Sequence, residues 1–197
     1  RRDPELTIAK PKTLTAYIWL VSGIPFIGGQ IRGIGARAAG RVTGSFVTSG
    51  ARARMVAEAR IHGTLYTAVA LLIVAGWTAP LIYWVVPALL GQPFLRLVLL
   101  AEHTGCALGG DMHINTRTTN TNVFVRFVMW NMSYHSEHHL YPGVPFYALP
   151  NVYSAMTETR DITALGYVKF HVDYVRALLA GRGAAFVDAT IEGPSSA

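Results

Sequence analysis

Charged residues are spread unevenly along the chain, and one long interval contains none. Between Arg60 and Arg96 there is no Asp, Glu, Lys or Arg. One straight helix through this interval would be about 50 Å long, well beyond the ~30 Å hydrocarbon thickness of a bilayer. Residues 76–80 (GWTAP) lie near its middle and have the composition of a turn. The pattern predicts a transmembrane helical hairpin, with helices over residues 57–76 and 80–101.

The flanks of this interval bear on its topology. Ten of the 17 Lys and Arg residues lie before residue 61, and the other seven lie after residue 95. Because basic flanks stay on the cytoplasmic side, residues 1–56 and 102–197 are expected on the same side of the membrane. A single tilted span is the alternative. A core hairpin of a soluble protein fits less well, because such helices carry a polar face.

The composition also favours a membrane protein. Hydrophobic residues make up 51% of the chain and charged residues 14%, whereas soluble domains carry roughly 25% charged residues. The net charge of +6 raises the question of nucleic-acid binding, but no basic stripe with interleaved aromatic residues is present. We therefore expect a membrane partner and no nucleic acid. Cys106 is the only cysteine, so no disulfide can form within the chain.

The first sixty residues are less regular. Residues 11–31 are apolar but interrupted by glycine and proline, and we expect them to lie along the membrane surface. Gly33, Gly35 and Ala38 match a loose dinucleotide-binding pattern, but no strand precedes them. A basic loop or surface helix is the better interpretation of this stretch.

Three histidines stand within five positions near the middle of the second half. Residues 123–140 contain no Gly or Pro and are predicted to form one helix. On that helix His135, His138 and His139 are spaced i, i+3 and i+4, so their side chains share a face and can bind one metal ion or two adjacent ions. A surface histidine cluster is the alternative. Imidazole donors suit iron, zinc and copper about equally.

Polar residues near the three histidines are candidates for positioning the metal ligands. The zinc-protease motif is absent, because Ser136 and not Glu follows the first histidine. Glu137 and Glu102 are each placed to hold a ligand imidazole through its second nitrogen, with solvated carboxylates as the alternative. We expect Arg117 to pack under the site and to pair with Asp111 or Glu137.

The sequence around these histidines resembles a known protein family. The run NTRTTNTNVFVRFVMWNMSYHSEHHLYPGVPFYALP is similar to the last histidine box of the membrane fatty acid desaturase and hydroxylase superfamily, notably its bacterial branch. AEHTGC resembles the segment where related members place one further histidine ligand, and RRDPEL resembles the sequence that follows the second box. The resemblance is strong over residues 98–153 and weak over residues 28–60.

The resemblance implies an all-α integral membrane protein, with a helical hairpin and with interfacial and cytosolic helices carrying a histidine-rich metal site. His135, His138, His139 and His103 would be ligands of a non-haem centre of two irons. That centre would use O₂ and a ferredoxin- or cytochrome-type electron donor to desaturate or hydroxylate a fatty acyl or lipid chain. The implied location is the bacterial inner membrane, with the box on the cytoplasmic side.

HSEHH (residues 135–139) is the one stretch of these 197 residues with the spacing of a histidine box, and the resemblance assigns it to the last box. The family's first box, HxxxH, and its middle box, HxxHH, therefore have no stretch of their own here. The alternative is therefore a non-catalytic, desaturase-like membrane subunit of a larger complex. The genomic sequence upstream of Arg1 would separate the two hypotheses. The expected organisation is a basic interfacial segment (1–56), the hairpin (57–101), the histidine-box region (102–180) and a tail (181–197).

Overall fold

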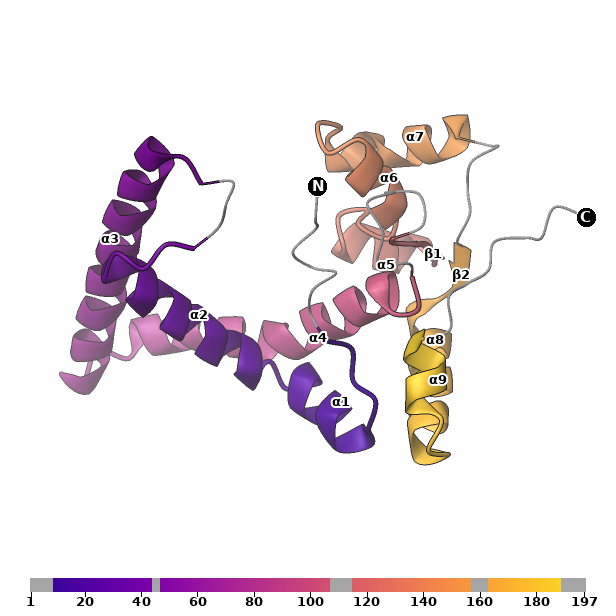
Figure 1. Ribbon diagram of the computed structural model, residues 1–197, viewed down its shortest axis with the longest axis horizontal. Helices are drawn as coiled ribbons and strands as arrows, with labels where there is room; N and C mark the ends of the chain where they lie inside the picture. The colour runs from indigo at the N-terminus through magenta and orange to yellow at the C-terminus, as the bar shows by residue number, and fades with distance from the viewer. Residues whose placement is uncertain (1–8, 44–46, 107–114, 157–162, 189–197) are drawn as a thin grey trace, which may run out of the picture. The chain divides into compact units, whose positions relative to one another are not determined.

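The computed structural model describes residues 9–43, 47–106, 115–156 and 163–188. The chain divides into two compact units, one of residues 19–94 and one of residues 1–18 with 95–197. It is mostly helical, as predicted (Figure 1). The elements are α1 (Leu14–Val21), α2 (Ile24–Ala38), α3 (Ser49–Val74), the π-helix η2 (Leu81–Val85), α4 (Val86–His103), β1 (Thr118–Asn120), α5 (Val123–Val128), α6 (His135–Leu140), the 3₁₀ helix η3 (Phe146–Ala148), α7 (Leu149–Ala155), β2 (Thr163–Leu165), α8 (Tyr167–Leu179) and α9 (Gly183–Asp188).

Two helical segments are long and apolar enough to cross a membrane, namely Ser49–Val74 and Leu81–His103. Only 6% and 17% of their apolar windows are buried within the protein, so most of these side chains face outward. This confirms the predicted membrane helices. The first helix begins earlier than residue 57, because the Thr48 hydroxyl caps it by accepting a hydrogen bond from the Ala51 amide at 3.2 Å.

The N-terminal apolar stretch forms α1 and α2, which meet at an angle of 57°. Gly23 lies at the junction with a φ of 75°, a left-handed conformation that glycine adopts without strain. A Cβ atom at this position would also collide with Cβ of Gln92. Taken together as one broken span, the two helices are also long and apolar enough to cross a membrane, which would make up to three membrane segments among the described residues.

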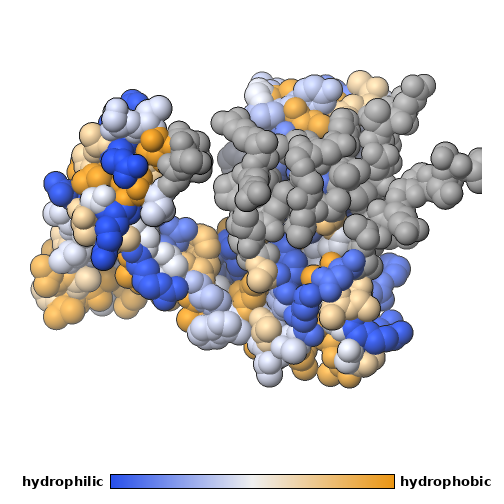
Figure 2. Space-filling model, in the orientation of Figure 1, coloured by the Kyte–Doolittle hydropathy of each residue, from blue (hydrophilic) through white to orange (hydrophobic). Residues whose placement is uncertain are grey.

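Hydrophobic side chains in the 19–94 unit gather at one end of α3. Figure 2 shows them over its C-terminal half and the start of the next helix, with hydrophilic side chains over its N-terminal half. Leu71, Val74 and Trp77 are among the exposed apolar residues there. Because exposure of large apolar side chains on this scale is unfavourable in water, this end of the unit is the part that fits the hydrocarbon of a bilayer.

The unit that contains the histidines has a core of its own. Its aromatic centre is formed by Tyr17, Phe170 and Tyr174, all of which are buried. The Tyr174 hydroxyl donates a 2.6 Å hydrogen bond to the Pro11 carbonyl and so ties α8 to the segment before α1. A parallel pair of short strands, with Thr118 opposite Thr163 and Asn120 opposite Leu165, joins the segment before the histidine box to the start of α8.

The predicted helix over residues 123–140 is in fact two short helices, α5 and α6. The Asn122 side chain caps α5 by accepting from the Val125 amide at 2.9 Å. Trp130 and Asn131 then adopt φ angles of 52° and 57°. This left-handed conformation ends α5 and lets α6 start in a new direction at His135, although no Gly or Pro marks the break in the sequence.

Candidate metal site

Three imidazole rings converge inside the second unit. His103 ends α4, and His135 and His139 lie one turn apart on α6. The His135 Nε2 atom lies 3.0 Å from Nε2 of His103 and 3.0 Å from Nε2 of His139. All three nitrogens fall within 4.8 Å of one another. His103 and His135 are buried and His139 is partly exposed, so the cluster is enclosed on most sides.

The spacing of these nitrogens fits one metal ion. Two nitrogens that each lie about 2.1 Å from a common ion, at right angles, are about 3.0 Å apart. This matches both close pairs. Three neutral imidazoles on one side of an ion also leave further coordination positions open, which a catalytic metal requires. The residues present therefore fit a bound transition-metal ion.

His138 lies outside this triad in the described part of the chain. Its ring centroid is 6.1 Å from that of His135 and 5.9 Å from that of His139. Within the described residues, the three histidines whose nitrogens converge are His103, His135 and His139. The i and i+4 pair, His135 and His139, is the one that faces His103.

A hydrogen bond fixes which nitrogen of His103 can bind a metal. Its Nδ1 atom lies 3.3 Å from the backbone carbonyl of Asn115. Because a carbonyl can only accept, Nδ1 carries the proton and donates, which leaves Nε2 with its lone pair toward the other two histidines. The segment that provides this carbonyl is held against α4 as well, since the Arg117 amide donates to the Glu102 carbonyl at 3.1 Å.

Glu102 is placed between a ligand candidate and a tyrosine. Its Oε2 atom lies 3.5 Å from Nδ1 of His135, and its Oε1 atom accepts a 3.0 Å hydrogen bond from the Tyr167 hydroxyl. The Glu102 residue is only 1% exposed. A carboxylate in this position orients the imidazole and raises its basicity toward a metal. Tyr167 was not among the residues predicted from sequence, and its 65-residue separation from Glu102 explains why.

Burial and charge set the protonation states of this group. Burial, and then the neighbouring His103, His139 and His138, lower the pKa of His135 well below its usual value. His135 is therefore neutral near pH 7, which is the form that binds metals. Burial raises the pKa of Tyr167, and the negative charge of Glu102 raises it further. The tyrosine accordingly stays protonated and keeps its hydrogen to donate.

Arg117 is buried, at 6% exposure, and not solvent-exposed. Its guanidinium group donates to the Thr104 carbonyl, lies 3.5 Å from the Cys106 sulfur and stacks 5.4 Å from the centre of the Phe170 ring. Within the described residues it makes no ion pair with Glu137, which instead accepts a 2.6 Å hydrogen bond from the Thr118 hydroxyl. Asp111, the other expected partner, lies outside the described residues.

Comparison with known protein families decides the relationship. The family model described as fatty acid desaturase matches residues 1–171. The chain belongs to the fatty acid desaturase family. Searches among curated proteins and among solved structures returned no match. Family membership, the histidine triad and the apolar helices together give a desaturase- or hydroxylase-type membrane protein whose histidines can bind a metal ion and whose substrate is a lipid.

Proposed function

We propose that this protein acts in the O₂-dependent desaturation or hydroxylation of a fatty acyl or other lipid chain at a non-haem di-iron centre. The observation that carries this proposal is the convergence of the Nε2 atoms of His103, His135 and His139 at one point. A chance surface cluster would leave histidines exposed and unoriented, whereas two of these three are buried. The family supplies the reaction class.

The residues of the site are suited to an oxidising reaction. When bound, iron would supply the activation of O₂ with two electrons from a ferredoxin- or cytochrome-type donor. Imidazole ligands tolerate this chemistry, whereas a thiolate would be oxidised, and Cys106 is not one of the triad. Glu102 and Tyr167 keep the His135 ring oriented. Arg117 and Glu137 stabilise the segment beneath the triad.

The proposed ligand set of the complete centre is larger than the triad. We assign His138 to it as well, because it shares the box helix and lies within 6.1 Å, centroid to centroid, of His135. Two irons need more nitrogen donors than the histidines of residues 103–139 offer. The proposal therefore includes ligands from segments with HxxxH and HxxHH boxes.

The proposed location is a bacterial inner membrane with the histidine site on the cytoplasmic side, by the positive-inside rule. Single cysteines at Arg37 and Arg182, in a chain whose Cys106 is replaced by Ala, would report sidedness. Labelling of both from the cytoplasmic side is expected. Labelling from opposite sides would contradict an even number of crossings.

The second candidate is a non-catalytic, desaturase-like subunit that packs against membrane partners. Its motivation is that residues 135–139 (HSEHH) are the one stretch of these 197 residues with the spacing of a histidine box. The two candidates differ in metal content and in product. A subunit without a catalytic role needs no iron and forms no oxidised lipid.

The decisive experiment measures iron by elemental analysis, and lipid products by mass spectrometry, in membranes supplied with a reduced ferredoxin. The His135→Ala variant should lose most of the iron and all of the oxidised product. Ser136→Ala, an alanine substitution one position away on α6, should retain both. Iron-free wild-type protein that forms no product would refute the enzyme and support the subunit.

A further inference from the structure

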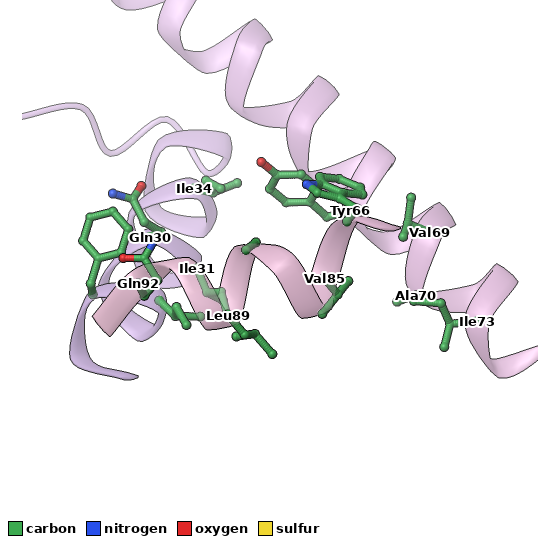
Figure 3. A pocket seen from close by; sticks show the side chains of 14 residues that line it. Gln30, Ile31, Ile34, Tyr66, Val69, Ala70, Ile73, Val85, Leu89 and Gln92 are labelled. Atoms are coloured by element: carbon green, nitrogen blue, oxygen red, sulfur yellow. The ribbon is translucent and has the colours of Figure 1, made fainter. Parts of the chain in front are cut away.

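A groove outside the metal site lies between α2, α3 and the helix that begins at Leu81. It has a volume of about 510 Å³ and is lined mainly by apolar side chains, including Phe26, Ile31, Val69, Ile73, Val85 and Leu89. Figure 3 shows α3 residues on one side and residues of α2 and α4 on the other. All lining residues belong to the 19–94 unit, so the groove shares no residue with the histidine triad. Its volume lies in the range of sites for small molecules.

A second, more polar pocket of about 270 Å³ adjoins the groove. Gln30, Ile34 and Tyr66 line both pockets. Beyond them the lining becomes charged, with Arg37 of α2 and Glu58 of α3. The change follows the hydropathy of α3, which is hydrophilic over its N-terminal half and hydrophobic over its C-terminal half (Figure 2). The two pockets are thus neighbours, one apolar and one polar, and the pair is called the channel below.

The polar pocket is lined by charges of opposite sign, Arg37 and Glu58, and also by His62. Arg37 and Glu58 make no ion pair with one another in the part of the chain that the structure describes. The Arg37 Nε atom donates to the Gly33 carbonyl at 3.0 Å, which holds the side chain along α2. A ligand that lies between them would therefore meet one cationic and one anionic group.

We propose that this channel binds one zwitterionic phospholipid, with an acyl chain in the apolar groove, the phosphate at Arg37 and the ammonium group at Glu58. The apolar part excludes a charged head, because none of its lining residues is Asp, Glu, Lys or Arg. The polar part matches both charges of the headgroup. An anionic lipid would meet Arg37 but would be repelled by Glu58. This inference does not depend on the proposed oxidation reaction.

The test uses purified protein in detergent and native mass spectrometry, with dioleoyl phosphatidylethanolamine and dioleoyl phosphatidylglycerol as competing probes. Wild-type protein should retain one molecule of the zwitterionic lipid in preference to the anionic one. Glu58→Gln should reduce that preference about two- to fivefold, the range of a partly exposed ion pair. Arg37→Gln should weaken retention of both lipids, whereas Arg54→Gln, an exposed change on α3 outside the channel, should not.

Filling the apolar groove tests the chain-binding part separately. Ala70→Phe places a large side chain in the lining at an exposed position of α3, so it should fold and should lower retention of both lipids. Gly91→Ala, a substitution on α4 outside the groove lining whose added Cβ would meet nothing within 4 Å, is a control that should leave retention unchanged. Equal retention of both lipids by wild type and charge variants, together with unchanged retention by Ala70→Phe, would overturn the proposal.

Discussion

The two units of this protein differ in where their polar and apolar side chains lie. In residues 19–94 the large apolar side chains are turned outward, as with Leu71 at 64% and Val74 at 85% exposure. In the other unit the interior is largely polar, and its buried residues include Glu102, His103, Thr104, Asn115, Thr116, Arg117, Thr118, Thr119, Ser133, His135 and Glu137.

This difference indicates what stabilises each of the two units. Outward apolar side chains are favourable only where the surrounding solvent is hydrocarbon, so the 19–94 unit depends on the membrane. A polar interior is favourable only where its groups are hydrogen-bonded, so the other unit depends on the hydrogen bonds made around the histidines. The same type of substitution should therefore have opposite consequences in the two units.

The largest effect is expected when a charge enters the outward face of α3. Leu71→Arg should disfavour membrane insertion by up to about 2.5–3.5 kcal/mol, because arginine is poorly tolerated in hydrocarbon. Val168→Arg, at a position of α8 that is 79% exposed, should change stability by less than about 0.5 kcal/mol. The measurement is the fraction of protein that resists alkaline extraction from membranes. Equal behaviour of the two variants would contradict the assignment of α3 to the bilayer.

The second prediction concerns the carboxylate behind His135. Glu102→Ala should weaken metal binding about 10- to 100-fold, the usual cost of losing a group that orients a ligand histidine. Tyr167→Phe, which removes only the hydroxyl that bonds Glu102, should weaken it less. Competition with a chelator of known affinity measures both.

Asp173→Ala provides the control for Glu102→Ala. Asp173 lies in the same unit but pairs with Lys169 at the surface, so its loss should leave metal affinity unchanged. If Glu102→Ala and Asp173→Ala gave the same affinity as wild type, Glu102 would have no role in positioning His135.

The third prediction tests the polar interior. Thr118→Val removes the hydroxyl that donates to Glu137 at 2.6 Å and leaves a buried carboxylate without this donor. The free energy of unfolding should fall by about 1–3 kcal/mol. Thr67→Val on α3, where the hydroxyl bonds the Gly63 carbonyl at an exposed position, should cost less than about 0.5 kcal/mol. Thermal unfolding in detergent compares the two, and equal losses would argue against a specialised polar core.

Sequence reasoning succeeded where one local pattern determines the structure. The charge-free interval between Arg60 and Arg96 was sufficient to predict the membrane helices, because length and hydropathy alone decide whether a segment can cross a bilayer. The resemblance to desaturases placed His103 with the histidine box although 32 residues separate it from His135. That contact rests on the fold of the family and not on any local pattern.

The details of the site were beyond such patterns. The break between α5 and α6 depends on left-handed conformations at Trp130 and Asn131, which neither residue type indicates strongly. Helical spacing put three histidines on one face, but only the position of His103 selects His135 and His139 from them. Tyr167 and Thr118 reach the carboxylates from distant parts of the chain, so tertiary packing alone identifies them.

The smallest effect is expected at Gln92, which lines the apolar groove of the 19–94 unit. Its side chain carries a buried polar atom, as do many side chains of the other unit. The Oε1 atom of Gln92 is buried and has no hydrogen-bond partner among the described residues. Gln92→Met replaces an unpaired amide by an apolar chain of similar length. Because an unpaired buried acceptor is unfavourable, the free energy of unfolding in detergent should stay unchanged or rise by up to about 1 kcal/mol, opposite in sign to Thr118→Val. Gln30→Met, at an exposed position of the same groove, should leave the melting temperature unchanged. A loss of stability in Gln92→Met comparable to that in Thr118→Val would show that the amide is bonded in the folded protein, and the contrast between the two units would then fail at this residue.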